Sequence, residues 1–294
     1  MGFHFSSFNM RVLIVGCGYV GLPLGGALAG LGHEVHGLRR SANTHAAMEE
    51  AGIVPHAVDI TRREQLDNLP GPFEWIINTV SSGRGGEEAY HGIYVEGTQN
   101  LIDWFAGSPP QKYLFTSSTG VYGQTNGSWV SEDSPAEPSS ETGRTLLEAE
   151  SLALSIGGIV LRLSGIYGPE RGHLYRQFLK GEAVMTGNPG RWMNMVHRDD
   201  VIGCILAAME TADPGTVLNA TDNEPVTQQG FFQWLTDQLD RTLPPQKPDV
   251  APHKRAQTNK RVTNSRAREI LSWTPKYPTW REGYAKLMES EGVL

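Results

Sequence analysis

The sequence predicts an α/β fold, a doubly wound parallel sheet followed by a smaller mixed C-terminal lobe. Three observations lead to this prediction. A run of four apolar residues, Val12 to Val15, is typical of a strand that is buried on both faces. A G-x-G-x-x-G pattern follows it and opens a helical run that extends to about residue 31. Strands and helices then alternate along the chain, as they do in right-handed βαβ units.

The glycine turn, residues 16–21, has the chemistry of a dinucleotide site. Its first glycine allows a tight turn, its second lets a pyrophosphate approach the backbone, and its third lets the helix pack close to the strand. The helix N-terminus offers free N–H groups to the phosphates. Because the pattern lies between a buried strand and a helix, it predicts a Rossmann-type cofactor site. We expect cofactor contacts from Gly16, Gly18, Tyr19, Val20 and Gly21.

The second predicted strand, residues 34–38, runs into two arginines that bear on the choice of cofactor. A carboxylate at this point would bind the ribose hydroxyls of NAD, whereas an arginine accommodates the 2′-phosphate of NADP. Arg39 lies 23 residues after Gly16, and Arg40 follows it. The sequence therefore favours NADP over NAD. The alternative is a solvated loop that holds two ordinary arginines.

The next two strands end in residues that suit the rest of the cofactor. A helix over 43–52 leads to a strand over 53–58, which ends at Asp59. The carboxylate of Asp59 could accept from the adenine amino group, cap the helical run that follows, or do both. The fourth strand, 73–78, ends in small residues that let a ribose pass. Further cofactor contacts are expected from Asp59, Ile60, Thr79, Val80 and Ser81.

The remaining elements complete the sheet and then become irregular. A helix over 87–105 precedes strands over 111–116 and 158–163. Later predicted elements are a helix over 173–180, a glycine-rich loop over 187–191, a strand-to-helix junction over 195–201, a strand over 216–220, a helix capped by Thr227, a basic proline-rich stretch over 244–261 and a helix opened by the capping box Thr279–Glu282. The basic stretch is interpreted as a solvated loop, with phosphate binding as the alternative. We predict a cofactor-binding domain over 1–165 and an interleaved substrate-side lobe over 166–294, packed on the sheet edge.

Composition argues against several classes of protein. The net charge of −7 argues against binding of nucleic acid or of an anionic membrane. No stretch is apolar enough to span a bilayer and residues 1–10 lack the features of a signal peptide, so we expect a cytoplasmic protein. Cys17 and Cys204 lie far apart, which predicts neither a disulfide framework nor a metal site.

Several motifs together resemble the extended short-chain dehydrogenase/reductase superfamily, the group of nucleotide-sugar epimerases and dehydratases. The resemblance covers nearly the whole chain. Its motifs are G-C-G-Y-V-G (16–21), G-I-Y-V-E-G-T-Q-N-L (92–101), S-S-T-G-V-Y-G (117–123), L-R-L-S-G-I-Y-G-P (161–169) and V-H-R-D-D-V (196–201). The resemblance implies an NADP(H)-binding oxidoreductase or epimerase that acts on a small molecule or a nucleotide-sugar-like substrate.

The chain departs from the catalytic set that this resemblance implies. In the superfamily a Ser or Thr at the strand end works with a Tyr-x-x-x-Lys, whose tyrosine exchanges a proton with the substrate and whose lysine lowers the pKa of that tyrosine. Ser118 matches the serine, but Thr142 stands at the tyrosine position and Leu146 at the lysine position. Glu150 matches the trailing acid, and residues 131–160 contain neither Tyr nor Lys. A threonine hydroxyl cannot be tuned toward neutrality as a phenol with a pKa of about 10 can.

Another group must therefore supply the proton if the protein is a redox enzyme. Tyr122 is the first candidate, with a packing role at the strand end as the equal alternative; Arg144 and His197 are weaker ones. The predicted catalytic residues are Ser118, Tyr122 and Thr142. The alternative function is a catalytically inactive NADP(H)-binding sensor or regulatory protein, since loss of both the tyrosine and the lysine also fits such a protein.

The resemblance also implies a substrate side. It places Tyr167 near the cofactor, and it places the segment 187–197 where relatives face a nucleotide-sugar diphosphate. Substrate contacts are therefore expected from Arg191, Asn194 and His197. Arg191 is the best candidate for a phosphate or carboxylate partner because a guanidinium binds such groups bidentately. The expected partners are a small-molecule substrate and, because relatives often dimerise, a second copy of the chain; no metal is expected.

Overall fold

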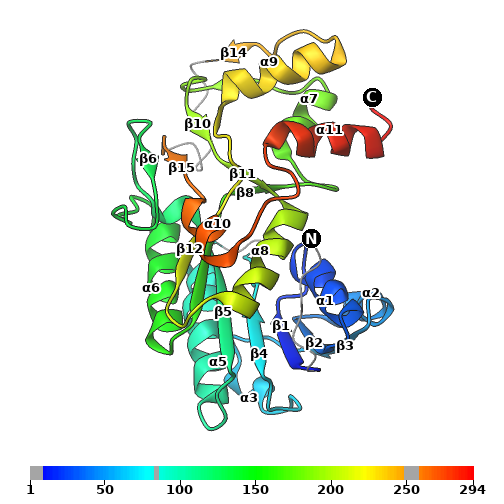
Figure 1. The fold of residues 1–294 in the computed structure, drawn as a ribbon, viewed down its shortest axis with the longest axis vertical. Helices are drawn as coiled ribbons and strands as arrows, with labels where there is room; N and C mark the ends of the chain where they lie inside the picture. Colours follow the sequence, from blue (N-terminus) through cyan, green and yellow to red (C-terminus); the bar gives the residue numbers. More distant parts are fainter. Residues whose placement is uncertain (1–8, 83–85, 248–257) are drawn as a thin grey trace. The chain divides into compact units, whose positions relative to one another are not determined.

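The computed structural model describes residues 9–82, 86–247 and 258–294 (Figure 1). The chain divides into two compact units. Unit 1 holds the chain up to Val121, Pro138–Arg162 and Ile205–Val217, and unit 2 holds Tyr122–Glu137, Leu163–Cys204 and Leu218–Leu294. The chain thus passes between the units several times. Residues 1–8 and residues 248–257 of the basic stretch lie outside the described residues.

Seven strands form one sheet in the order β12-β7-β5-β4-β1-β2-β3. The adjacent strands from β3 to β5 pair in parallel. The strand order reverses between β1 and β4, the kind of switch point at which doubly wound sheets bind ligands. The strands are β1 (Arg11–Val15), β2 (Glu34–Arg39), β3 (Ile53–Ala57), β4 (Trp75–Asn78), β5 (Lys112–Ser118), β7 (Ile159–Leu163) and β12 (Val217–Ala220). The predicted fold class is confirmed.

Burial explains why these segments form strands. Residues 12–15 of β1 are fully buried, as the unbroken apolar run predicts for a strand covered on both faces. The helical elements that connect or follow the strands are α1 (Gly21–Gly30), η1 (Ala42–Thr44), α2 (His45–Glu50), α3 (Arg63–Leu66), α4 (Gly86–His91), the π-helical η2 (Gly92–Glu96), α5 (Gly97–Phe105), η3 (Thr119–Val121), α6 (Glu141–Ser155) and α8 (Arg198–Thr211). The helix predicted over 87–105 is therefore present, with a π-helical segment inside it.

Unit 2 is built from short strands and from helices around an aromatic core. Its two-stranded sheets are β10-β13, β11-β8, β14-β9 and β15-β6. Their strands are β6 (Trp129–Val130), β8 (Gly165–Tyr167), β9 (Met185–Thr186), β10 (Trp192–Met193), β11 (Met195–His197), β13 (Val226–Thr227), β14 (Gln246–Lys247) and β15 (Arg261–Val262). The helices are α7 (His173–Leu179), α9 (Gln228–Leu239), α10 (Ser265–Leu271) and α11 (Trp280–Ser290). Among these strands, β11 lies in the predicted strand-to-helix junction over 195–201, and the others were not predicted.

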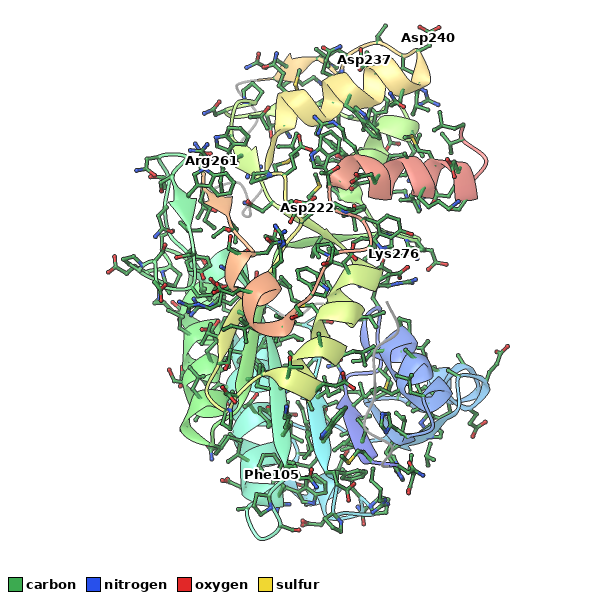
Figure 2. The ribbon with its side chains drawn as sticks, in the orientation of Figure 1. Phe105, Asp222, Asp237, Asp240, Arg261 and Lys276 are labelled. Atoms are coloured by element: carbon green, nitrogen blue, oxygen red, sulfur yellow. The ribbon has the colours of Figure 1, made fainter. Side chains whose placement is uncertain are left out.

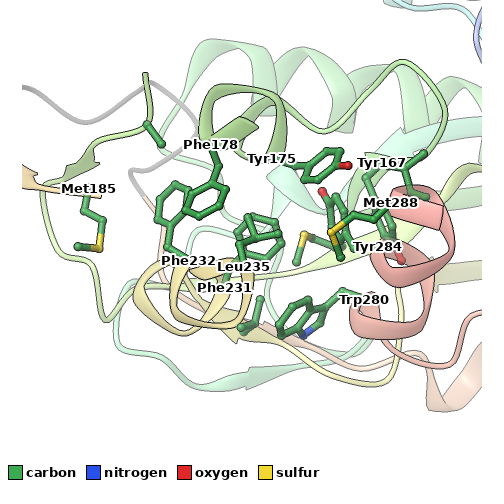
Figure 3. Close-up of a cluster of buried hydrophobic side chains, with 14 residues drawn as sticks. Tyr167, Tyr175, Phe178, Met185, Phe231, Phe232, Leu235, Trp280, Tyr284 and Met288 are labelled. Carbon is green, nitrogen blue, oxygen red and sulfur yellow. The ribbon is translucent and has the colours of Figure 1, made fainter. Parts of the chain in front are cut away.

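Aromatic side chains hold the helices of unit 2 together (Figure 3). Tyr167 from β8 stacks on Tyr284 from α11, with ring centroids 4.3 Å apart. The close approach requires Gly283, because a Cβ there would lie 1.9 Å from the Tyr167 hydroxyl oxygen. Thr227 caps α9 by accepting from the backbone N–H of Gly230, and the predicted capping box at Thr279 opens α11. Both predicted helix starts are confirmed.

Candidate functional site

The glycine turn has the geometry that its sequence predicts. Gly16 has a φ of +97°, and a Cβ there would lie 2.9 Å from the Val80 backbone. A Cβ on Gly21 would lie 2.3 Å from the Gly16 carbonyl oxygen, so α1 packs tightly against the turn. At Gly18, by contrast, an added Cβ would meet first the side chain of Arg39, at 3.2 Å. The first and third glycines thus serve the fold, while the second leaves the backbone open to a ligand.

The carboxyl ends of β1 and β4 meet at this turn. Thr79 donates from its hydroxyl to the Gly16 carbonyl oxygen at 3.0 Å, and its backbone N–H donates to Val15 at 2.8 Å. Helix α1 begins without a side-chain cap, and its first turn carries no acidic residue. Its N–H groups are therefore free of a competing carboxylate. The predicted residues Tyr19 and Val20 lie in the turn itself, and Ser81 is exposed just beyond β4.

The structure also brings Arg39 to the glycine turn. Its Nη1 donates to the Cys17 carbonyl oxygen at 3.2 Å, so the guanidinium lies beside Gly18. Arg40 is exposed. At the end of the neighbouring strand, Asp59 accepts from both the backbone N–H and the hydroxyl of Thr61, at 3.1 and 2.8 Å. Asp59 thus orders the turn after β3 and does not cap α3, whose N-cap residue is Arg62.

Cys17 lies inside the turn but is no nucleophile. Its side chain is buried, and its Sγ lies 2.4 Å from the position of a Cβ on Gly37. Burial raises the pKa of the Cys17 thiol to about 12, so the thiolate is not populated near neutral pH. The side chain fills space between the turn and β2, as expected.

Two adjacent serines at the end of β5 have different surroundings. Ser117 is buried and donates to Glu150 Oε1 at 2.5 Å. Glu150 in turn accepts hydrogen bonds from Nε and Nη2 of Arg162. The shortest joins Nη2 to Oε2 at 2.7 Å. Ser118 is half-buried, and its Oγ accepts from the backbone N–H of Gly120 at 3.1 Å. Because this leaves the Ser118 hydroxyl proton uncommitted among the described residues, Ser118 can donate to a ligand.

Thr142 and Leu146 stand at the positions of the missing tyrosine and lysine, and neither can take over proton donation. Thr142 is exposed near the start of α6 and donates to the hydroxyl of Ser140 at 3.3 Å. Leu146 is buried on the same helix. Arg144 is exposed and paired with Glu141. None of these residues replaces the acidity of a phenol beside an ammonium group.

Tyr122 is committed to the structure of unit 2. Its ring is fully buried, and its hydroxyl donates to Asn219 Oδ1 at 2.9 Å. Asn219 is itself buried; its amide also donates to the Thr263 carbonyl oxygen, and its backbone N–H donates to Glu132. This geometry favours the packing role of Tyr122 over the role of proton donor.

His197 and Asn194 are also engaged within unit 2. The His197 ring is buried between Tyr167 and Tyr277, and its Nδ1 accepts from the backbone N–H of Asp199 at 3.1 Å. Burial lowers the pKa of His197 to about 4, so the ring is neutral near pH 7. Asn194 donates to the Lys260 carbonyl oxygen and accepts from the backbone N–H of Val262. Both side chains are therefore anchored within unit 2, but among the described residues the Nε2–H of the neutral His197 ring and the second amide N–H of Asn194 have no acceptor.

The Tyr167 side chain is likewise engaged within unit 2. It is 1% exposed and lies in the aromatic core of that unit. Burial raises the pKa of the Tyr167 phenol far above its usual value. The side chain is thus a packing group, because β8 directs the ring into this core, and a position of Tyr167 near the cofactor stays a prediction.

Among the described residues the Arg191 guanidinium has no hydrogen-bond acceptor, and near it lies a residue that sequence reasoning missed. Arg191 is half-buried, and burial lowers its pKa. Lys260 is 5% exposed and donates to the Tyr122 carbonyl oxygen at 2.8 Å. Burial and the nearby charge of Arg191 lower the pKa of Lys260 to about 8. The prediction of a solvated loop is wrong at Lys260, because its side chain points into unit 2.

The described residues provide neither a metal site nor a membrane-spanning helix. Within the described ranges, no group of three or more His, Cys, Asp or Glu residues could hold a metal ion. In the part of the chain that the structure covers, every helix is too short or too polar to cross a membrane.

Comparison with protein families matches residues 12–220 to the NAD dependent epimerase/dehydratase family. Protein YeeZ of Escherichia coli strain K12 is 29% identical over 278 residues, which cover 91% of this chain and 96% of YeeZ. The 3-diazoavenalumate denitrifying reductase of a Streptomyces species is 28% identical over 310 residues, covering 94% of this chain and all of that protein.

Among solved structures, a putative NAD-dependent epimerase/dehydratase from Methylobacillus flagellatus is 32% identical. It matches with a TM-score of 0.78 and covers 96% of this chain and 99% of that one. The likeness therefore extends through both units and includes the glycine turn and the segments that carry Ser118 and Arg191.

Proposed function

Because this chain belongs to the NAD dependent epimerase/dehydratase family, we propose that it is an NADP(H)-dependent oxidoreductase or epimerase with a small-molecule substrate. The observation that carries the proposal is the glycine turn with Arg39 across it. Gly18 leaves the backbone open, the first turn of α1 carries no acidic residue, and the Arg39 guanidinium lies 3.2 Å from the Cys17 carbonyl oxygen. These residues fit a dinucleotide whose adenosine ribose carries a phosphate.

The preference for NADP rests on charge. Arg39 ends β2, where a carboxylate would favour the free ribose hydroxyls of NAD. One of its five N–H groups is used by the Cys17 carbonyl oxygen, and among the described residues the others have no partner. A 2′-phosphate would supply acceptors for them. The exposed Arg40 could add a second positive charge.

When bound, a nicotinamide cofactor gives or accepts hydride. The chain's own contribution to the reaction is a hydrogen-bond donor at the substrate oxygen, and Ser118 is the predicted residue with a free hydroxyl proton. The Tyr122 hydroxyl donates to Asn219, the neutral His197 ring accepts at Nδ1 from the backbone of Asp199, and no phenol stands on α6. We therefore assign Ser118 to orienting and hydrogen-bonding the substrate. A hydroxyl of ordinary acidity serves this role without being ionised.

Substitution of Arg39 tests the choice of cofactor. We expect Arg39→Asp to weaken NADPH binding at least tenfold more than NADH binding, since a carboxylate repels the 2′-phosphate. Tryptophan fluorescence quenching by each cofactor would measure the two dissociation constants. The control Arg63→Asp changes an exposed arginine of α3 and should leave both constants unchanged. Equal losses of NADH and NADPH affinity in Arg39→Asp would overturn the NADP assignment.

A second experiment separates an enzyme from a sensor. Absorbance at 340 nm should show oxidation of NADPH with at least one member of a panel of carbonyl compounds and nucleotide sugars. Ser118→Ala should reduce that rate by about 10²-fold or more, the size expected for loss of a positioned donor. Tight NADPH binding without turnover on the panel, together with a partner protein whose affinity depends on the redox state of the cofactor, would instead support the sensor.

A further inference from the structure

Two cations in unit 2 lie close together without an acidic partner. Lys260 is 5% exposed, and its ammonium donates to the Tyr122 carbonyl oxygen at 2.8 Å and to Thr258 Oγ1 at 2.9 Å. Arg191 is half-buried, and its positive charge acts on Lys260. Across the described ranges, no carboxylate compensates either charge. Both Lys260 hydrogen bonds go to neutral oxygens, so one N–H remains.

Hydrogen bonds from two asparagine side chains hold together the segments that carry these two cations. The backbone N–H of Trp192 donates to Asn259 Oδ1 at 2.9 Å. Asn194 donates to the Lys260 carbonyl oxygen at 3.0 Å and accepts from the Val262 N–H at 2.7 Å. The segment that follows Arg191 is therefore bound to both sides of Lys260. These bonds keep the backbone of the two cationic residues in neighbouring segments.

The next residue, Arg261, shows that not every cation here is available. Its guanidinium lies over the rings of Trp129 and Trp192, with centroid distances of 5.0 and 5.2 Å. Its Nε donates to the Gly127 carbonyl oxygen at 2.9 Å. Figure 2 labels Arg261 on β15. Arg261 is thus satisfied by aromatic faces and a carbonyl group, whereas its neighbour Lys260 faces Arg191.

Burial of a charge is unfavourable unless an opposite charge or several hydrogen bonds compensate it. Arg191 offers five N–H groups in a planar fork, and Lys260 offers its remaining one. An oxyanion would accept from both and cancel their repulsion. We infer that Arg191 and Lys260 form a binding site for an oxyanion, a carboxylate or phosphate group. Its assignment to the substrate rests on the proposed function.

The ionisation of Lys260 provides a direct measurement. The chain has seven lysines, so their side chains can be followed together by NMR after 13C labelling, and the signal lost in Lys260→Met identifies Lys260. We expect inorganic phosphate or acetate to raise the pKa of Lys260 by about one pH unit, because a bound anion favours the ammonium form. Sodium chloride at the same ionic strength serves as the control for screening.

Comparison of the two probes identifies the chemical class. A rise with phosphate and not with acetate indicates a phosphate group, and the reverse result indicates a carboxylate; either supports the site. Arg191→Gln should raise the pKa of Lys260 without any anion and remove the response to the anion. Lys286→Gln, which changes an exposed lysine paired with Glu289, should change neither. No response to either anion, or an equal response to chloride, would overturn the inference.

Cofactor binding in the same samples separates this inference from the function on which it rests. If NADPH binds and Lys260 responds to neither anion, the oxyanion site is wrong and the cofactor assignment stands. If Lys260 responds and NADPH fails to bind, the proposed function is wrong and the oxyanion site stands.

Discussion

Two buried cationic centres of this molecule differ in whether the chain supplies their negative charge. In unit 1, Arg162 lies against Glu150, and both side chains are less than a tenth exposed. In unit 2, Lys260 lies near Arg191, and within the described residues no carboxylate balances them. Both centres are held by strands and loops of the fold. Only in the first centre, among the described residues, does a carboxylate balance the buried positive charge.

The difference separates structural charge from functional charge. Glu150 accepts hydrogen bonds from Arg162 and from Ser117, so each of the two charges in this centre has a partner of opposite sign. Removal of either charged partner leaves the other one buried and alone. In unit 2 the chain already bears this unfavourable state, and a ligand would relieve it. The same physical rule therefore predicts opposite responses to substitution at the two centres.

The largest effect should come from breaking the complete centre. Glu150→Gln keeps the size of the side chain but leaves the buried Arg162 without a counter-charge. We expect the free energy of unfolding to fall by about 3–5 kcal/mol. Urea denaturation followed by circular dichroism would measure it.

Glu141→Gln is the matched control for this substitution. Glu141 lies on the same helix, pairs with Arg144, and both members of that pair are about half exposed. The loss there should stay within about 0.5 kcal/mol, since solvent screens the pair. Equal losses in the two variants would show that the Glu150–Arg162 pair is no more important than a surface ion pair.

The incomplete centre also shows the limit of prediction from the sequence. The glycine turn could be predicted because its requirements are local: Gly16 needs a positive φ and Gly21 a close helix. The environment of Tyr122 could not, because its hydroxyl partner Asn219 lies 97 residues further along the chain. Lys260 was assigned to a solvated loop for the same reason, since a contact 138 residues away buries it.

One local signal could have identified Lys260. Side chains alternate along a strand, so Lys260 and Val262 lie on the same face while Arg261 lies on the other. Val262 is apolar and 1% exposed, which places Lys260 on the inward face beside it. The basic composition of the stretch concealed this alternation.

An intermediate effect concerns the pH dependence of stability. Burial and Arg191 lower the pKa of Lys260 to about 8, while the unfolded chain keeps an ordinary lysine pKa of 10.5. Between these values the unfolded state binds more protons, so stability rises with pH in this window. From pH 7.5 to 9.5 the contribution of Lys260 should increase stability by about 2 kcal/mol. Lys260→Met should lack this part of the rise in urea titrations at each pH, and Lys286→Gln should retain it. Parallel pH profiles for the wild type and Lys260→Met would contradict an uncompensated charge at this position.

The smallest effect tests whether hydrogen bonds also complete the centre in unit 1. Ser117→Ala removes the hydroxyl that donates to Glu150 Oε1, while Arg162 keeps its bonds to both carboxylate oxygens. We therefore expect a loss of about 1.5 kcal/mol in the free energy of unfolding, the lower end of the range for a hydrogen bond to a charged group. Ser118→Ala, at the next position, should change stability by less than about 0.5 kcal/mol, because Ser118 is half-buried and lacks a charged partner. The two variants should also separate in kinetics, since the hydroxyl of Ser118 is the one assigned to the substrate. If Ser118→Ala proved the more destabilising, the division between a structural and a functional serine at the end of β5 would be wrong.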